Sequence, residues 1–227
     1  MGLFLQVQTT RQKRTNINRK GWLLAFAVGP LMLAAFTYAV VVRGNDAETA
    51  FSVQSSLTIA PLSEWPYYVS AAVIAVEDRR FFTHSGVDWL GIARAAIKNT
   101  RAGRVVQGGS TLTQQLIKNL CLTPERTVSR KLRELVYALK LEKSLQKQEI
   151  LALYLKTVYF GAGAYGIENA ARTYFGKSSR SLELHEAALL VGLLKSPSVY
   201  NPLKHRDRAI TRMRKVLSDM VSLGALN

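Results

Sequence analysis

Two adjacent carboxylates, Glu77 and Asp78, end an apolar run that extends from Val69 to Val76. The run has the composition of a buried helix, and neighbouring residues of a helix point about 100° apart. We therefore expect one carboxylate to face a cleft while the other caps or pairs locally. Apolar neighbours desolvate a carboxylate and raise its pKa, which makes it a usable proton acceptor or donor. In the alternative interpretation, both are a solvated helix end paired with Arg79 and Arg80.

A glycine-bearing stretch, Gln107–Gln115, is a second candidate for chemistry. It puts flexible backbone, hydroxyl groups and two amides at the entrance to a predicted helix. Exposed backbone N–H groups at such an entrance suit an anion or a sugar. The alternative is an ordinary loop in which Ser110 or Thr111 is the helix N-cap.

A basic segment, Arg126–Glu134, follows this stretch and precedes residues 160–166. On a helix, Arg126, Arg130, Arg133 and Glu134 fall at i, i+4, i+7 and i+8, with Lys131 beside them. Such a cluster suits a phosphate or pyrophosphate, because Arg offers paired donors and Lys a point charge. The alternative is a solvated basic face. If the first interpretation holds, these cations and Glu77 should line the same groove.

Helical periodicity dominates the part of the chain that must position these residues. The segments with apolar residues at helical intervals are 69–76, 90–97, 111–120, 128–145, 148–159, 182–194 and 210–223. We predict a mainly α domain with little sheet. Residues 160–166 are interpreted as a turn-rich link between helices, and residues 53–59 as a short strand or an extended arm.

The N-terminal part predicts a membrane anchor. Residues 21–42 contain no charged residue and are long enough to span a bilayer as a helix. The preceding residues 1–20 are basic, so the tail is expected in the cytoplasm and the rest of the chain outside the inner membrane. A cleaved signal peptide is the alternative. The predicted organisation is a tail (1–20), a transmembrane helix (21–42), a linker (43–64) and a catalytic domain (65–227).

The charge balance restricts the partners. The formal net charge is +16, with 31 Lys and Arg against 15 Asp and Glu. Such an excess predicts an anionic partner: nucleic acid, an acidic membrane surface or a phosphorylated substrate. The predicted location outside the cytoplasm argues against nucleic acid.

Five sequence blocks, taken in order, resemble those of the peptidoglycan glycosyltransferases, the family that includes a module of the bifunctional penicillin-binding proteins. The resemblance covers about Trp65 to Gly224. It is specific because Gly-Gly-Ser-Thr and Thr-Gln-Gln follow Glu-Asp and precede Arg-Lys-x-x-Glu. The matching residues are Glu77, Asp78, Phe81, His84 and Gly86; 108–115; Arg130, Lys131 and Glu134; Ile150, Leu151, Tyr154 and Leu155; and Arg212, Val216 and Leu217.

This resemblance implies a lysozyme-like domain beside the membrane that polymerises lipid II into β-1,4 glycan strands and releases undecaprenyl pyrophosphate. It implies that Glu77 is the base on the acceptor 4-hydroxyl and that Glu134 is a second essential carboxylate. Substrate and pyrophosphate binding would fall to Ser110, Thr111, Gln114, Gln115, Lys118, Arg126, Arg130, Lys131 and Arg133. One departure from the family pattern is Lys156, where Tyr-Leu-Asn is usual. We expect Lys156 either to add a phosphate contact or to disturb a network at a helix end.

Elementary chemistry agrees with this function. A lipid pyrophosphate is a good leaving group, so the reaction needs cations to stabilise the departing charge rather than a strong general acid. The acceptor hydroxyl needs a base, placed opposite the leaving group because the reaction inverts the sugar carbon. Two rivals remain: a lytic enzyme with Glu77 as general acid, and a membrane-tethered module that binds the cell wall without chemistry.

Cofactors and further partners follow less directly from the sequence. No His, Asp and Glu cluster has metal-ligand spacing, so the sequence predicts no definite cofactor. A divalent cation (Mg or Mn) that assists the pyrophosphate is left as an open alternative. Expected partners are lipid II, the lipid-linked glycan chain, the membrane, and cell-wall synthesis or division proteins.

Ser144 to Lys147 matches the transpeptidase Ser-x-x-Lys by chance, and no Lys-Thr-Gly follows. We therefore predict a monofunctional enzyme.

Overall fold

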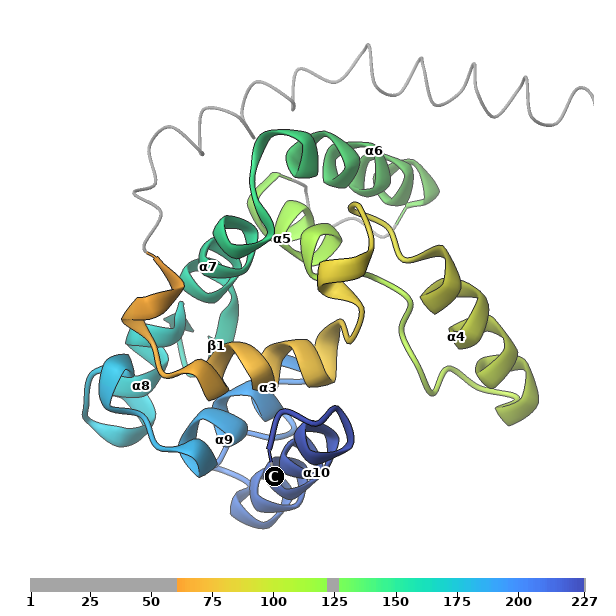
Figure 1. Ribbon diagram of the computed structural model, residues 1–227. Coiled ribbons are helices and arrows are strands. Elements are labelled where there is room, and N and C mark those ends of the chain that lie inside the picture. The colour runs from red at the N-terminus through yellow and green to blue at the C-terminus, as the bar shows by residue number, and fades with distance from the viewer. Residues whose placement is uncertain (1–60, 122–126, 227) are drawn as a thin grey trace, which may run out of the picture.

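The computed structural model of the protein describes residues 61–121 and 127–226, and these form a mainly helical fold, as predicted (Figure 1). The predicted tail, transmembrane helix and linker up to residue 60, and the predicted site residue Arg126, lie outside the described residues. In the described ranges, no helix has the length and apolar character needed to cross a membrane. The helices are α3 (Tyr67–Glu77), α4 (Trp89–Ala102), α5 (Leu112–Cys121), α6 (Val128–Ser144), α7 (Lys147–Thr157), α8 (Ile167–Phe175), α9 (Leu184–Leu194) and α10 (Arg206–Ser222).

Helix α9 lies at the centre of one group of helices, where it packs against α3 and α10 (Figure 1). Its side chains are buried on nearly every side, which explains why its sequence is almost wholly apolar after Glu186. Its N-terminus is closed by a capping box between Glu183 and Glu186, which satisfies N–H groups that the first turn leaves free. This group holds the end of α3, where Glu77 lies.

A second group contains α5, α6 and α7, with α5 packed on both of the others. Helix α7 is also surrounded by core, and its residues from Ile150 to Leu155 are all buried. Helix α4 is different, because only Ala95 is buried on it. It extends to one side of the two groups (Figure 1).

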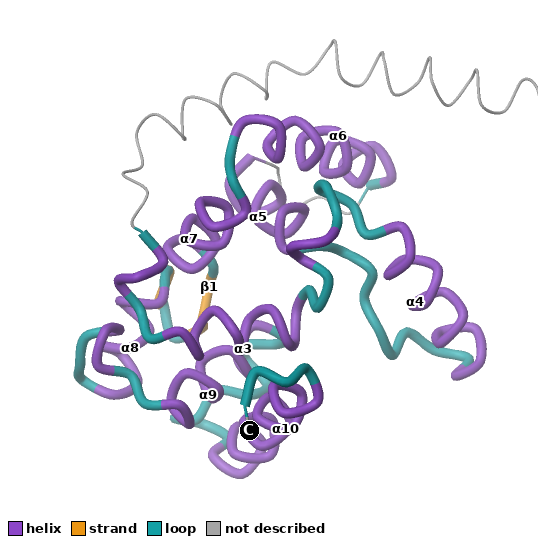
Figure 2. Tube along the Cα trace, in the orientation of Figure 1, coloured by secondary structure: helices purple, strands orange, loops and turns teal. Residues whose placement is uncertain are grey.

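The main difference from the sequence prediction lies in the segment that follows α7. Residues 160–166, interpreted as a turn-rich link, belong largely to an antiparallel hairpin of β1 (Tyr159–Gly161) and β2 (Ala164–Tyr165) (Figure 2). Helix α8 was not predicted, because its nine residues are too few to show a clear helical period. The 3₁₀ turns Leu62–Glu64, Phe81–Thr83 and Ser179–Ser181 complete the described elements.

Gly166, between β2 and α8, carries the tightest backbone contact among the described glycines. Its φ is +80°, and a Cβ there would lie 2.3 Å from the carbonyl oxygen of Lys156. We expect Gly166→Ala to lower the free energy of unfolding by about 3 kcal/mol or more, since a backbone clash adds to the cost of the positive φ. Gly163→Ala is the matched control, because Gly163 has φ +78° with nothing within 4 Å of an added Cβ. Urea unfolding of both variants measures the difference, and equal losses would contradict the predicted clash.

Candidate active site

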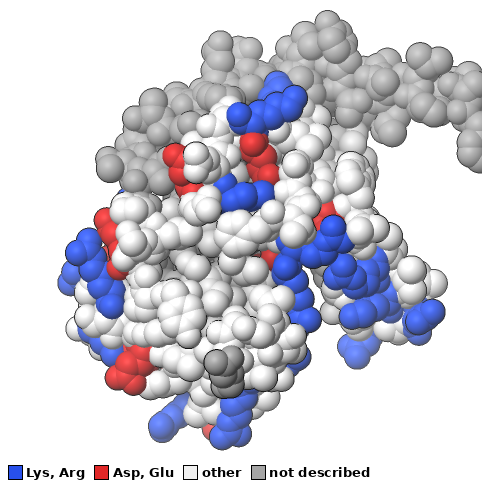
Figure 3. All heavy atoms as spheres, in the orientation of Figure 1, with Lys and Arg blue, Asp and Glu red and all other residues white. Residues whose placement is uncertain are grey.

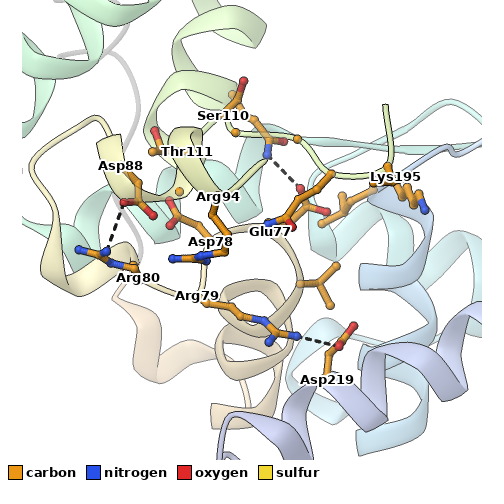
Figure 4. Close-up of a pocket in the computed structure, with 18 of the residues that line it drawn as sticks. Glu77, Asp78, Arg79, Arg80, Asp88, Arg94, Ser110, Thr111, Lys195 and Asp219 are labelled. Atoms are coloured by element: carbon orange, nitrogen blue, oxygen red, sulfur yellow. Dashed lines mark hydrogen bonds and ion pairs between the residues drawn. The ribbon is translucent and has the colours of Figure 1, made fainter. Parts of the chain in front are cut away.

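A cavity of about 480 Å³ lies where the C-terminal end of α3 meets α4, α5 and α10 (Figure 4). The loop between α4 and α5 forms another part of its wall. Its lining is mostly polar or charged, and includes Glu77, Asp78, Arg79, Arg80, Asp88, Arg94, Gly108, Gly109, Ser110, Thr111, Gln115, Lys118, Lys195, Arg212 and Asp219. The cavity therefore contains much of the predicted site.

Glu77 lies in the wall of this cavity at the last turn of α3. Its Oε2 accepts a hydrogen bond of 2.9 Å from the Nε2 of Gln115 on α5. Burial raises the pKa of Glu77 above 4.5, while the Gln115 hydrogen bond and the charges of Arg212 and Lys118 work in the opposite direction. The predicted rise in pKa by desolvation is confirmed in direction.

Asp78 turns to other partners, as expected for the neighbouring position on a helix. Its Oδ2 accepts the backbone N–H of Leu112 at 3.0 Å, at the first residue of α5. The Nε2 of His84 lies 3.0 Å from both of its carboxylate oxygens. Asp78 therefore joins the start of α5 to the end of α3, which sets the position of Gln115 relative to Glu77.

The alternative in which Glu77 and Asp78 pair with Arg79 and Arg80 is wrong. The Nη2 of Arg79 lies 2.7 Å from Oδ1 of Asp219 on α10. Arg80 approaches Asp88 at 3.7 Å, just before α4. Both contacts are drawn in Figure 4. Each arginine thus joins the end of α3 to another wall of the cavity.

The remaining residues of the first block pack the loop after α3. Phe81 is fully buried, with its ring edge-on to that of His84 at a centroid distance of 6.2 Å. Gly86 has φ +79°, and a Cβ there would lie 3.0 Å from the backbone of Ala138 on α6. The Gly86 carbonyl accepts a hydrogen bond of 2.7 Å from the Oγ1 of Thr111. Glycine is needed at this position both for its conformation and for the close approach to α6.

The glycine-bearing stretch combines the two interpretations offered from the sequence. Thr111 and Gln114 form a reciprocal cap at the start of α5: the Thr111 N–H donates to Oε1 of Gln114 at 3.0 Å, and the Gln114 N–H to Oγ1 of Thr111 at 3.2 Å. Thr111 is therefore the N-cap of α5, as the alternative predicted. Gln114 is buried and does not line the cavity, whereas Ser110, Thr111 and Gln115 do. The substrate contact expected for Gln114 stays a prediction.

The basic segment on α6 does not share the Glu77 cavity in the way that the sequence suggested. Among the described residues, none that line the cavity comes from α6. Glu134 is buried and holds two cations, with the Nζ of Lys131 at 2.7 Å and the Nε of Arg130 at 3.2 Å. Lys131 also reaches the cavity wall, because its Nζ donates a hydrogen bond of 2.9 Å to the Oγ of Ser110.

Arg130, Lys131 and Arg133 are thus not among the described residues that line this cavity, and the expectation that they share a groove with Glu77 stays a prediction. Within α6, the buried Glu134 carboxylate pairs with Arg130 and Lys131, which holds both side chains along the helix. Glu134 holds Lys131, which in turn contacts Ser110 of the cavity wall, and its expected role as a second essential carboxylate stays a prediction.

The cations that line the cavity come instead from other elements. Figure 3 shows Lys and Arg side chains gathered on both sides of the hollow beside α4. Lys118 and Arg212 belonged to the predicted set, whereas Arg79, Arg80, Arg94 and Lys195 were missed as cavity residues. Arg94 is the missed cation that the sequence marks as unusual, because it is a charged residue within the apolar pattern of residues 90–97.

The cavity also contains four carboxylates, but in the described ranges no group of three His, Cys, Asp or Glu side chains could together hold a metal ion.

Lys156, which departs from the family pattern, lies away from Glu77. It lines a different pocket of about 480 Å³, together with Trp65, Tyr165 and the start of α8. Tyr154, two residues earlier, faces the other way and donates a hydrogen bond to Gln115 at 3.2 Å. Lys156 therefore lines a pocket other than the Glu77 cavity, and the expected phosphate contact or disturbed helix-end network stays a prediction.

A partly buried carboxylate with a raised pKa, beside a basic cavity in a helical domain, is typical of enzymes that activate a hydroxyl next to an anionic leaving group. Comparison with known proteins specifies the class. The family model described as Transglycosylase matches residues 44–221. The chain belongs to this family, the peptidoglycan glycosyltransferases.

Similarity to individual proteins agrees with this family assignment. Penicillin-binding protein 1A of Aquifex aeolicus is 53% identical over 159 residues, which is 70% of this chain and 22% of that protein. Penicillin-binding protein 1A of Escherichia coli K12 is 48% identical over 163 residues, or 72% of this chain and 19% of that protein. The chain thus spans about a fifth of these relatives. A Cupriavidus necator protein provisionally named a transglycosylase is 39% identical over 208 residues, 90% of this chain and 89% of that protein.

Proposed function

We propose that the protein polymerises lipid II into β-1,4-linked glycan strands, with inversion and with release of undecaprenyl pyrophosphate. One observation carries the proposal: Glu77, a carboxylate with a raised pKa, lies in a cavity whose other walls supply cations from α4, α5 and α10 and from the residues that follow α3 and α9. Membership of the peptidoglycan glycosyltransferase family supports the reaction class.

In the proposed reaction Glu77 takes the proton from the 4-hydroxyl of the acceptor sugar. The acceptor oxygen forms a bond to the anomeric carbon of the donor as the bond from that carbon to the pyrophosphate oxygen breaks. The electron pair leaves with the pyrophosphate, whose developing charge is stabilised by Lys118, Arg212 and the neighbouring cations. A divalent cation on the pyrophosphate would add to the same stabilisation.

The finer features expected from the sequence remain proposals. They include the lysozyme-like architecture, the anchor in the inner membrane with the catalytic domain on the extracytoplasmic side, and the association with cell-wall synthesis or division proteins. The expected monofunctional organisation is supported by the match to the Cupriavidus necator protein along most of both chains.

Purified lipid II and preformed peptidoglycan, given separately to the full-length protein in detergent or liposomes, test the proposal. We expect polymer from lipid II, seen as a ladder on a gel, with release of undecaprenyl pyrophosphate. Soluble fragments from preformed peptidoglycan would instead identify a lytic enzyme. Binding to both without any product would identify a wall-binding module, and either result would overturn the proposed polymerisation.

The raised pKa of Glu77 predicts the acidic limb of the pH–activity profile. A base must be deprotonated to work, so activity should fall as the pH drops through the pKa of Glu77, with a midpoint above 4.5. Initial rates from about pH 4 to pH 9 measure it. As a control, protein held at the lowest pH is returned to neutral pH and should recover full activity, which separates protonation from unfolding. A rate that stays constant down to pH 4.5 would show that burial does not tune this base.

A further inference from the structure

Three helices meet in a chain of two hydrogen bonds that ends on Glu77. The hydroxyl of Tyr154 on α7 donates to Oε1 of Gln115 on α5 at 3.2 Å. The Nε2 of Gln115 then donates to Oε2 of Glu77 on α3 at 2.9 Å. Tyr154 is fully buried and does not line the cavity, whereas Gln115 and Glu77 do. The tyrosine can therefore influence the cavity only through the amide.

A glutamine amide has two ends of opposite character, and its orientation decides what it offers to a carboxylate. With the NH₂ group toward Glu77, it stabilises the ionised base. With the carbonyl oxygen toward Glu77, it repels the ionised form and favours the protonated form. Burial beside Glu77 raises the pKa of Tyr154 well above its ordinary value, so the phenol keeps its proton as a donor. A donor at this point favours the first orientation.

We propose that Tyr154 is a positioning residue for the base: its hydroxyl fixes the Gln115 amide so that the NH₂ group holds Oε2 of Glu77 and leaves Oε1 to accept the proton of the acceptor sugar. The inference rests on the proposed polymerisation for its kinetic consequence, but the hydrogen-bonded arrangement itself does not depend on it. It also gives Gln115 a different task from the substrate contact expected from the sequence.

Other charged groups act on Glu77 from the elements around it. Arg212 on α10 and Lys118 on α5 lower the pKa of Glu77, whereas Asp78 on α3 raises it. Replacing Tyr154 by Phe alters none of these charges and keeps the buried ring. It removes one oxygen, so a change in the behaviour of Glu77 can be assigned to the loss of the amide's restraint.

Steady-state kinetics of Tyr154→Phe over a range of pH test the inference. We expect kcat for lipid II polymerisation to fall about tenfold, with KM changed less than about twofold, since one hydrogen bond to a positioned group is lost. The acidic limb should move to higher pH, because the ionised form of Glu77 loses support. Tyr174→Phe is the matched control: its hydroxyl donates to the backbone carbonyl of Phe160, away from the cavity. It should match the wild type.

A double-mutant cycle separates positioning from a general loss of structure. If Tyr154 acts through Gln115, Tyr154→Phe should have no further effect on kcat or on the acidic limb in a Gln115→Ala background. Additive losses in the double variant would overturn the inference, and so would a Tyr154→Phe protein with wild-type kcat and an unchanged acidic limb.

A measurement that needs no activity keeps this inference distinct from the proposed function. The ¹³C resonance of the Glu77 carboxyl group, assigned by its disappearance in Glu77→Gln, reports the pKa directly. We expect a higher Glu77 pKa in Tyr154→Phe than in the wild type or in Tyr174→Phe. An unchanged pKa would overturn the inference even if lipid II is polymerised. Failure of the wild type to polymerise lipid II would instead overturn the proposed function.

Discussion

Glu77→Gln should polymerise lipid II about 10³-fold more slowly than the wild type, the loss expected when a general base is removed. Gln keeps the size of the side chain and can still accept the hydrogen bond from Gln115, which Glu77 accepts at 2.9 Å. It cannot take a proton from the acceptor hydroxyl. The rate of polymer formation from lipid II, followed on gels at neutral pH, measures the effect. A residual rate within about tenfold of the wild type would show that another group is the base.

The same variant should not be less stable at neutral pH. The pKa of Glu77 is raised in the folded protein, so the folded state binds its proton more tightly than the unfolded state does. The resulting stability is present at low pH and is lost as the pH rises through the folded pKa, because the buried carboxylate becomes charged. Removing that charge relieves the cost, and we expect a Tm at or above that of the wild type.

Glu186→Gln is a matched control with the opposite sign. Burial tends to raise the pKa of Glu186, but its hydrogen bonds with Lys177 and the Glu183 backbone lower it overall. Stability from this group is present at neutral pH and lost as the pH falls, so Glu186→Gln should lower the Tm at neutral pH. Thermal unfolding of both variants compares them. A Glu77→Gln protein that unfolds at a lower temperature than the wild type would contradict the assignment of Glu77 as a partly buried, destabilising charge.

Lys118→Ala should reduce kcat about 10²-fold, the second-largest effect that we expect. Lys118 lies on α5, lines the cavity and lowers the pKa of Glu77, so its charge acts at the site. A preorganised cation is worth most where charge develops on the leaving group, here the pyrophosphate. The side chain is exposed, so its truncation should change the Tm little. Steady-state kinetics with lipid II, together with thermal unfolding, measure both effects.

Two further variants complete this experiment. Lys118→Arg keeps the charge and should recover part of the rate, although the planar guanidinium does not place its charge as an ammonium does. Lys143→Ala removes an exposed lysine of α6 that does not line the cavity, and should behave as the wild type. Equal losses in Lys118→Ala and Lys143→Ala would show that the overall positive charge matters, rather than a cation beside the leaving group.

Helix positions and the principal carboxylate were predictable because both depend on local sequence. The periodic apolar pattern predicted α3, α5, α6, α7, α9 and α10, since each buries one face or is wholly buried. It also predicted α4, although only Ala95 of that helix is buried. The end of the apolar run at Glu77 predicted a desolvated carboxylate, and its pKa is raised by burial. The nine-residue α8 and the short hairpin before it are too brief for such a signal.

The partners of the charged residues were less predictable, because they come from distant parts of the chain. Arg79 lies 140 residues from Asp219, its partner at 2.7 Å. Cations on α6 looked from the sequence like a clamp for phosphate, yet Glu134 on the same helix holds Lys131 and Arg130. Lys195 follows an apolar helix and had no pattern to mark it as a residue of the cavity.

By itself the sequence determined the helical class, the family to which the chain belongs and the carboxylate in the last turn of α3, because these follow from residue types and their spacing. Only the tertiary structure decided which cations surround Glu77, that Lys156 faces another pocket, and that Tyr154 reaches Glu77 through Gln115. The physical reason is that a side chain's charge and hydrogen bonds act over a few ångströms, and the packing of helices far apart in the sequence sets those distances.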